Sequence, residues 1–202
     1  MKHLIKIVIY KLFSRYLVRL GNPEQIYITF DDGPHPINTL KILDVLGKYN
    51  VKATFFMLGS EMEKFPDIVK NVINQGHSIG YHSYYHSSMK ELTINSIFKD
   101  LNYADKLNSQ FNYKIKILRP PYGDLTISGL VWIMVNNWKI IMWSKDSRDS
   151  FDSKEKVIKN ILAEKITPGE ILLFHDDYDD TPFIIDTVLT NFSENNIKFG
   201  VF

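Results

Sequence analysis

The chain has 202 residues, of which 45% are hydrophobic, and its 24 lysines and arginines nearly balance its 23 aspartates and glutamates. This length supports one sizeable hydrophobic core and leaves too little chain for a second domain of similar size. The net charge of +1 argues against a nucleic-acid partner, because such proteins concentrate basic residues against phosphates. The absence of cysteine excludes disulfides, thiolate nucleophiles and cysteine-ligated zinc.

Residues 1–22 form an apolar segment that basic residues interrupt, so no run reaches the roughly 20 apolar residues that a membrane-spanning helix needs. The segment also lacks the small-residue cleavage site of a secretory signal. Lys11, Arg15 and Arg19 recur every fourth residue, which predicts a basic amphipathic helix over residues 1–22, ahead of a domain at 23–202. Such a helix could pack on the domain or make peripheral membrane contact through residues 2–20.

After residue 23, short β-rich runs alternate with longer segments of helical periodicity, which indicates a parallel α/β fold. The seven expected strands are residues 25–30, 53–58, 78–81, 116–118, 139–143, 170–174 and 198–202. The six expected helices are residues 39–49, 61–75, 93–111, 127–136, 153–164 and 182–193.

Unusual polar side chains follow five of the expected strands. They are Asp31 and Asp32 after the first strand, His82 and His86 after the third, Arg119 after the fourth, Asp146 and Asp149 after the fifth, and His175 after the sixth. Ligands of parallel α/β proteins bind at the loops that follow the carboxyl ends of the strands. We therefore expect these five loops to converge on one pocket.

The first two of these loops suggest a metal site. Asp31 and Asp32 place two like charges side by side, which is unfavourable unless a cation separates their roles. His82 and His86 are four residues apart, a spacing that puts both imidazoles on one helical face and suits one metal ion. Either aspartate could complete a set of two histidines and one carboxylate that leaves positions open for water and substrate.

The other loops suggest proton transfer. Arg119 lies in a proline-stiffened loop, where it could be a surface cation or could hold a neighbouring carboxylate ionised as a base. His175 ends an apolar strand, where histidines are often simply core residues. A His175 paired with Asp149 or Asp146 would instead have a raised pKa and could act as a general acid.

Residues 76–80, GHSIG, also match the nucleophile elbow of α/β-hydrolases, with Ser78 as the nucleophile. That motif needs a strand before the serine and a helix after it. Here a helical pattern precedes Ser78 and strand-like residues contain it, so a serine esterase is the least favoured of the functions considered.

Taken together and in order, the motifs resemble the polysaccharide deacetylases of carbohydrate esterase family 4, the NodB homology domain, over residues 25–202. The segments that carry the resemblance are residues 29–34 (TFDDGP), 82–86 (HSYYH), 119–123 (RPPYG), 146–149 (DSRD) and 173–176 (LFHD). The resemblance implies the α/β fold of that family, a distorted, TIM-barrel-like (β/α)7 barrel.

The resemblance also implies roles for the metal site and the base. Asp32, His82 and His86 would bind the metal, usually zinc, with cobalt or another divalent transition metal able to substitute. Asp31 would be the general base, steadied by Arg119. Because adjacent residues of an extended chain point to opposite faces, we expect the turn at Gly33-Pro34 to aim both carboxylates into one pocket.

For the acid and the substrate, the resemblance implies that His175 is the general acid, with Asp149 as its chief partner and Asp146 in the same catalytic set. The substrate-binding residues would be Tyr122, through its backbone N-H, together with Leu173, Pro121 and Phe151. One departure affects this pocket: Ser150 stands where the family has a tryptophan, so one wall is missing or is rebuilt by Phe151.

The resulting hypothesis is a metal-dependent hydrolase that removes N-acetyl groups from an amino sugar in a glycan or glycolipid precursor. Its partner would be an N-acetylated oligosaccharide, a polysaccharide or a lipid-linked saccharide, and the protein is expected to be a monomer. The alternatives are a carbohydrate-binding barrel with little or no turnover and a serine esterase using Ser78. The basic start of the chain favours a cytoplasmic or peripheral membrane location, with an extracytoplasmic one as the alternative.

Overall fold

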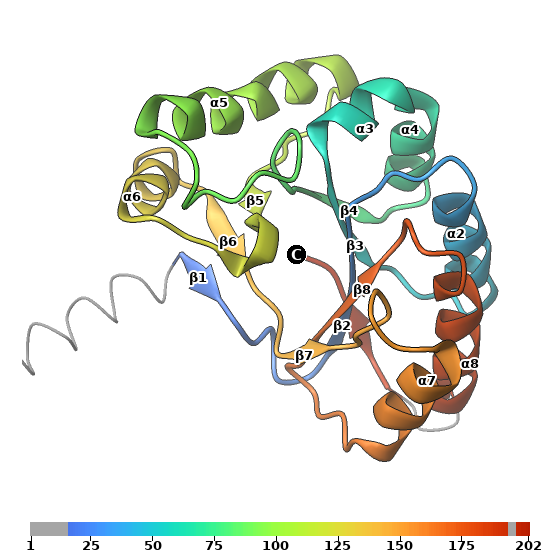
Figure 1. The fold of residues 1–202 in the computed structure, drawn as a ribbon. Coiled ribbons are helices and arrows are strands. Elements are labelled where there is room, and N and C mark those ends of the chain that lie inside the picture. The colour runs from blue at the N-terminus through green and yellow to red at the C-terminus, as the bar shows by residue number, and fades with distance from the viewer. Residues whose placement is uncertain (1–15, 194–196) are drawn as a thin grey trace, which may run out of the picture.

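The computed structural model describes residues 16–193 and 197–202, and Figure 1 shows a curled parallel sheet surrounded by helices. The strands are β1 (Leu17–Val18), β2 (Ile26–Asp31), β3 (Thr54–Met57), β4 (Ser78–Tyr81), β5 (Ile117–Leu118), β6 (Lys139–Ile141), β7 (Lys145–Asp146), β8 (Ile171–His175) and β9 (Phe199–Gly200). Their order is β1-β6-β5-β4-β3-β2-β8-β7, with β9 paired to the start of β2. All seven predicted strands are present, and β1 and β7 add to them.

The sheet curls because one stretch of backbone, residues 139–146, carries two strands. Its first part, β6, pairs with β5, and its last part, β7, pairs with β8. The series of paired strands that runs from β6 to β7 therefore begins and ends on the same stretch of chain, which closes the sheet into a barrel. The predicted fold class, a distorted (β/α)7 barrel, is confirmed.

The helices cover the outside of the curled sheet (Figure 1). They are α2 (Asn38–Lys48), α3 (Gly59–Lys64), α4 (Pro66–Asn74), α5 (Ile94–Phe111), the 3-10 turn η1 (Pro121–Gly123), α6 (Ile127–Val135), α7 (Lys154–Ala163) and α8 (Thr181–Ser193). Because parallel strands are covered on both faces, the central strands β2, β3 and β4 are buried throughout. Every residue of β2 is buried, and Phe30 stacks on Phe55 at a centroid distance of 4.9 Å in the core.

The helix predicted over residues 61–75 is two helices, α3 and α4, so the prediction of one continuous helix is wrong. Pro66 begins α4, and Phe65 before it has φ −125° and ψ 57°. Proline disfavours a helical conformation in the residue that precedes it, so the chain turns between the two helices.

The helix predicted over residues 1–22 lies largely outside the described residues. Within the described part the prediction is wrong, because Leu17 and Val18 form β1 and pair with Ile140 and Ile141 of β6. The edge of β6 offers backbone groups that β1 satisfies, which a helix could not do. Among the described residues, no helix combines the length and the apolar character needed to cross a membrane.

Candidate active site

The predicted site residues meet at the carboxyl ends of the strands, around a pocket of about 360 Å³. Its lining includes the metal and proton-transfer candidates Asp31, Asp32, His82, His86, Asp146 and His175, and the substrate candidates Tyr122, Phe151 and Leu173. A larger depression of about 590 Å³ lies near the amino ends of the strands, beside Ile26 and Lys198. It shares none of these residues, so the smaller pocket is the candidate site.

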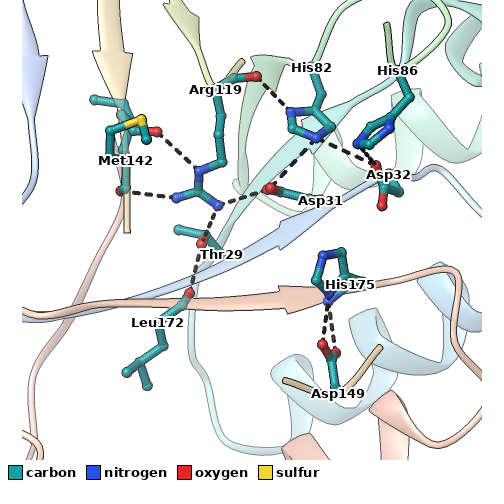
Figure 2. Close-up of polar contacts among 11 residues, drawn as sticks. Thr29, Asp31, Asp32, His82, His86, Arg119, Met142, Asp149, Leu172 and His175 are labelled. Atoms are coloured by element: carbon teal, nitrogen blue, oxygen red, sulfur yellow. Dashed lines mark hydrogen bonds and ion pairs between the residues drawn. The ribbon is translucent and has the colours of Figure 1, made fainter. Parts of the chain in front are cut away.

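Asp31 ends β2 and is paired with Arg119. The Arg119 Nη1 donates to Asp31 Oδ1 at 2.7 Å, and both side chains are almost completely buried (Figure 2). The paired guanidinium holds the carboxylate in one position. Asp31 Oδ2 lies 3.7 Å from His82 Nε2, on the side of the metal candidates.

Arg119 is held by four further contacts. Its Nε and Nη2 donate to the backbone oxygens of Ile141 and Met142, at 3.0 and 3.2 Å. Its Nη1 also donates to Thr29 Oγ1 at 2.8 Å, and its guanidinium lies 4.2 Å from the centre of the Phe56 ring. Removing it from water is costly unless its donors are satisfied, and these contacts satisfy them. The guanidinium therefore has one fixed orientation toward Asp31.

His82 follows β4 and is oriented by the same arginine. Its Nδ1 lies 2.6 Å from the backbone oxygen of Arg119, which can only accept, so Nδ1 carries the proton and Nε2 keeps its lone pair. Burial lowers the pKa of His82 to about 4, against a smaller opposing effect of Asp31. A neutral imidazole with Nε2 facing the pocket is the form that binds a metal.

Asp32 reaches the two histidines because its own backbone is left-handed, with φ 78°. This conformation costs a non-glycine residue about 1–3 kcal/mol and reverses the outward direction that an extended chain would give it. Asp32 Oδ1 consequently lies 3.5 Å from His82 Nε2 and 3.3 Å from His86 Nε2. The left-handed residue lies immediately before Gly33-Pro34, the turn expected to aim both carboxylates, so the redirection begins at Asp32 itself.

Asp32, His82 and His86 fit a divalent metal. Their ligand atoms all lie within 4.8 Å of one another, and no other such group of three occurs in the described part of the chain. Asp32 Oδ1 is buried without a hydrogen-bond donor. Burial and the charge of Asp31 raise the pKa of Asp32 to about 7, and burial lowers the pKa of His86. A cation would satisfy the unpaired oxygen and both lone pairs together.

His175 ends β8 and pairs with Asp149. Its Nδ1 lies 2.7 Å from Asp149 Oδ1, and its backbone N-H donates to Asp149 Oδ2 at 2.8 Å (Figure 2). Thr181 Oγ1 also donates to Asp149 Oδ2, so the carboxylate is fixed. Burial opposes the charged imidazole, but the hydrogen bond and charge of Asp149, together with the charges of Asp31 and Asp32, raise the pKa of His175 to about 9.

The choice left open between Asp149 and Asp146 is resolved by these distances in favour of Asp149. Asp146 is exposed at the rim of the pocket, and its Oδ1 accepts from the backbone N-H of Arg148 at 2.8 Å. That bond closes a local turn. Asp146 therefore shapes the loop that delivers Asp149 and has no contact with His175 among the hydrogen bonds of the described residues.

The pocket wall differs in part from the prediction. Leu173, Tyr122 and Phe151 line it as predicted, and Phe151 is 77% exposed. Pro121 is buried, and its neighbour Pro120 lines the pocket instead, so the prediction of a Pro121 contact does not match the geometry.

Two aromatic wall residues, Trp143 and Tyr178, were missed. Each follows the carboxyl end of a strand, β6 and β8 respectively. Trp143 supplies an aromatic wall from a position other than Ser150.

Ser78 does not have the geometry of a serine nucleophile. It begins β4, at the opposite end of that strand from His82, and its Oγ donates to the backbone oxygen of Phe202 at 2.6 Å. A nucleophile elbow needs the serine on a strand-to-helix turn beside a histidine. The serine-esterase alternative is therefore wrong.

A parallel barrel with a carboxylate–histidine metal set facing a second carboxylate–histidine pair is the architecture of a hydrolase of the deacetylase type. The profile of the polysaccharide deacetylase family matches residues 20–136, more than half of the chain, so the chain belongs to the polysaccharide deacetylase family.

Two curated deacetylases align with most of the chain. A peptidoglycan-N-acetylglucosamine deacetylase of Bacillus cereus is 39% identical over 156 residues, which are 76% of this chain and 56% of the relative. The peptidoglycan-N-acetylglucosamine deacetylase PgdA of Listeria monocytogenes is 34% identical over 178 residues, which are 87% of this chain and 37% of the relative. The chain thus spans about half the length, or less, of these curated relatives.

A solved structure agrees with the fold. The crystal structure of the Bc1960 peptidoglycan N-acetylglucosamine deacetylase, in complex with a naphthalenyl N-oxidanyl-benzamide, superimposes with a TM-score of 0.87 at 32% identity. The match covers 95% of this chain and 94% of that one. The barrel described here therefore has the same fold as the Bc1960 deacetylase.

Proposed function

We propose that this chain is a metal-dependent hydrolase that removes the acetyl group from N-acetylglucosamine residues of peptidoglycan. The observation that carries the proposal is one pocket with the buried Asp31–Arg119 pair and the Asp32, His82 and His86 set on one side and the His175–Asp149 pair on the other. The choice of peptidoglycan, among the glycans considered from sequence, is supported by the names of the curated relatives.

We propose zinc as the metal, with cobalt able to substitute, held by Asp32 Oδ1 and the Nε2 atoms of His82 and His86. When bound, the metal would supply Lewis acidity, polarising the acetamide carbonyl and making a water molecule easier to deprotonate. Nitrogen and oxygen donors of this kind suit zinc and related divalent transition metals.

Asp31 would act as the general base. Its Oδ1 is occupied by Arg119, which leaves Oδ2, on the side of the metal candidates, to take a proton from the attacking water. A C–O bond then forms at the acetyl carbon. The backbone N-H of Tyr122, in the left-handed turn η1 at the pocket wall, would donate to the oxyanion that develops.

His175 would act as the general acid. With its pKa raised to about 9, the imidazole is protonated at neutral pH, and Asp149 occupies Nδ1, so the transferable proton is on Nε2. That proton passes to the sugar nitrogen as the amide C–N bond breaks. The products are acetate and a free amino sugar, while Leu173 and Trp143 would enclose the acetyl methyl group.

The test is acetate release from peptidoglycan fragments that contain N-acetylglucosamine. Activity should disappear after treatment with a chelator and return on addition of zinc or cobalt. His82→Ala, treated in the same way, is the control whose acetate release should not return when metal is added. Activity that persists in the chelated protein would contradict the metal-dependent mechanism.

A carbohydrate-binding barrel with little turnover remains the second candidate, because Ser150 leaves the pocket wall without the family tryptophan and Phe151 is largely exposed beside it. This alternative predicts that zinc-loaded protein binds peptidoglycan fragments and releases no acetate, whereas Ser150→Trp releases it. The predictions on location, membrane contact and monomeric state stay predictions.

A further inference from the structure

Asp176, next to the proposed acid in sequence, is a carboxylate that the mechanism does not use. It is only 1% exposed and is not among the residues that line the pocket. Burial raises its pKa to about 8, against the opposing hydrogen bond from Thr39, and its Oδ1 has no donor among the described residues. A buried carboxylate is expensive to keep, so its contacts indicate what it does.

The contacts of Asp176 all lead to the segment that carries the proposed base and metal ligand. Its backbone N-H donates to the backbone oxygen of Asp31 at 3.2 Å. Its Oδ2 accepts from Thr39 Oγ1 at 2.5 Å, and Thr39 Oγ1 in turn accepts from the backbone N-H of His35 at 2.7 Å. Asp176 is thus connected to the chain on both sides of Asp32.

Between these two attachments, the Asp176 carboxylate lies directly against Gly33. A Cβ atom at position 33 would be 2.1 Å from Asp176 Oδ2, 2.2 Å from Oδ1 and 2.5 Å from Cγ, which is too close for any atom to fit. Gly33 is not among the glycines with positive φ, so its backbone would accept a side chain. The carboxylate of Asp176, and not the turn itself, is what requires glycine there.

We propose that Asp176 is a positioning residue that braces residues 31–35 and so holds the carboxylate of Asp32 toward His82 and His86; this rests on the metal site of the proposed function. A non-glycine residue stays left-handed, as Asp32 does at φ 78°, only when its surroundings fix it. The contacts at Asp31, Gly33 and His35 fix the chain before and after Asp32. Outer contacts of this kind orient the groups that bind a metal.

The test is zinc affinity, measured on the full chain by competition with a chromophoric chelator. Asp176→Ala removes the carboxylate contacts with Thr39 and Gly33, keeps the backbone bond to Asp31, and should weaken zinc binding about 10- to 100-fold. Asp176→Asn keeps the size and shape and should bind zinc much as the unaltered chain does. Equal losses in both variants would assign the effect to the charge of Asp176 and would overturn the brace, as would an unchanged affinity in Asp176→Ala.

A double-mutant cycle makes the contact with Gly33 specific. Gly33→Ala should weaken zinc binding in the unaltered chain, because the new methyl group collides with Asp176. It should cause no further loss in Asp176→Ala, where the three nearest atoms are gone. The same loss in both backgrounds would show that the two residues act independently, against the proposal.

Two further variants distinguish the loss of the Asp176 contacts from a general loss of stability. Val157→Ala opens a cavity in the core beneath α7, far from this segment, and should lower Tm without changing zinc affinity. If Asp176→Ala does not fold, Thr39→Val removes only the hydroxyl that holds Oδ2, and its zinc affinity should fall. An unchanged affinity in Thr39→Val would then overturn the proposal. Zinc affinity is measured without substrate. A chain that binds zinc and releases no acetate would therefore refute the proposed function and leave the role of Asp176 untouched.

Discussion

His82 and His175 face the same pocket and are anchored in almost the same way, yet they have opposite protonation behaviour. Each is held through Nδ1 by a short bond, 2.6 Å to the backbone oxygen of Arg119 for His82 and 2.7 Å to a carboxylate oxygen of Asp149 for His175 (Figure 2). Burial lowers the pKa of His82 to about 4. Burial also opposes the charge on His175, but Asp149 outweighs it and raises the pKa to about 9.

The difference follows from the partner of Nδ1. A carbonyl oxygen fixes the tautomer and adds little negative charge, so a buried imidazole stays neutral and presents the lone pair of Nε2. A carboxylate fixes the same tautomer and also stabilises the cation, so Nε2 keeps a proton. One residue type would thus supply the proposed metal ligand on one side of the pocket and the proposed acid on the other.

The largest expected effect comes from removing the ligand histidine. His82→Ala should weaken zinc binding by more than the roughly 10- to 100-fold expected for the loss of an outer contact, and acetate release should fall with it. Metal content after dialysis, measured by elemental analysis, checks this. Full zinc occupancy in His82→Ala would show that His82 is not a ligand, and the contrast between His82 and His175 would no longer hold.

Asp31→Asn should separate binding of the metal from turnover. The amide cannot take a proton, so kcat should fall about 10²- to 10⁴-fold, while zinc stays bound. The change also leaves Arg119 buried without its counter-charge, which costs about 3–5 kcal/mol of stability, so kcat must be measured well below a separately determined Tm. Loss of zinc together with turnover would reassign Asp31 to the ligands.

Asp149→Asn should make His175 resemble His82. Without the carboxylate, burial is opposed only by the charges of Asp31 and Asp32, and the pKa of His175 should fall from about 9 toward its ordinary value of 6.5. The acid works only when protonated, so the alkaline limb of kcat/KM should move to lower pH, with a loss of about fourfold at pH 7 if the pKa reaches 6.5. An unchanged alkaline limb would mean that His175 does not control it.

Ser150→Trp should have the smallest effect on proton transfer, because it alters the wall between the two histidines and neither of their partners. A change of about tenfold or less in kcat/KM for the acetyl substrate is expected, mainly through KM. Comparing acetyl with propionyl substrates checks whether the open wall admits a larger acyl group. A large gain in kcat would favour the weakly active binding protein as the natural state of the chain.

The sequence predicted the strands and the meeting of five loops because both depend on apolar periodicity and on the rule that parallel strands end at the same edge. The same reasoning found Asp31, Asp32, His82, His86, Arg119 and His175. It could not choose between Asp149 and Asp146, since both follow the same strand and only the turn at Arg148 decides which carboxylate meets His175.

Other features depend on contacts between distant parts of the chain. The left-handed backbone of Asp32 depends on contacts with Asp176, just after β8, and Thr39 of α2, which local propensity does not contain. The strand β1 exists because β6 has an open edge, so the helical pattern around it was overridden by tertiary pairing. Trp143 was passed over because a tryptophan at a strand end is ordinary core in most proteins.

Arg119 has a consequence for how the two chemistries of the pocket can be varied. Its side chain is the counter-ion of Asp31, while its main-chain carbonyl is the anchor of His82. A substitution at position 119 removes the counter-ion of Asp31 and leaves the carbonyl that anchors His82 in place. The spacing between the proposed proton acceptor and the proposed ligand therefore depends on the geometry of a single residue, and a side-chain substitution can alter only one of its two contacts.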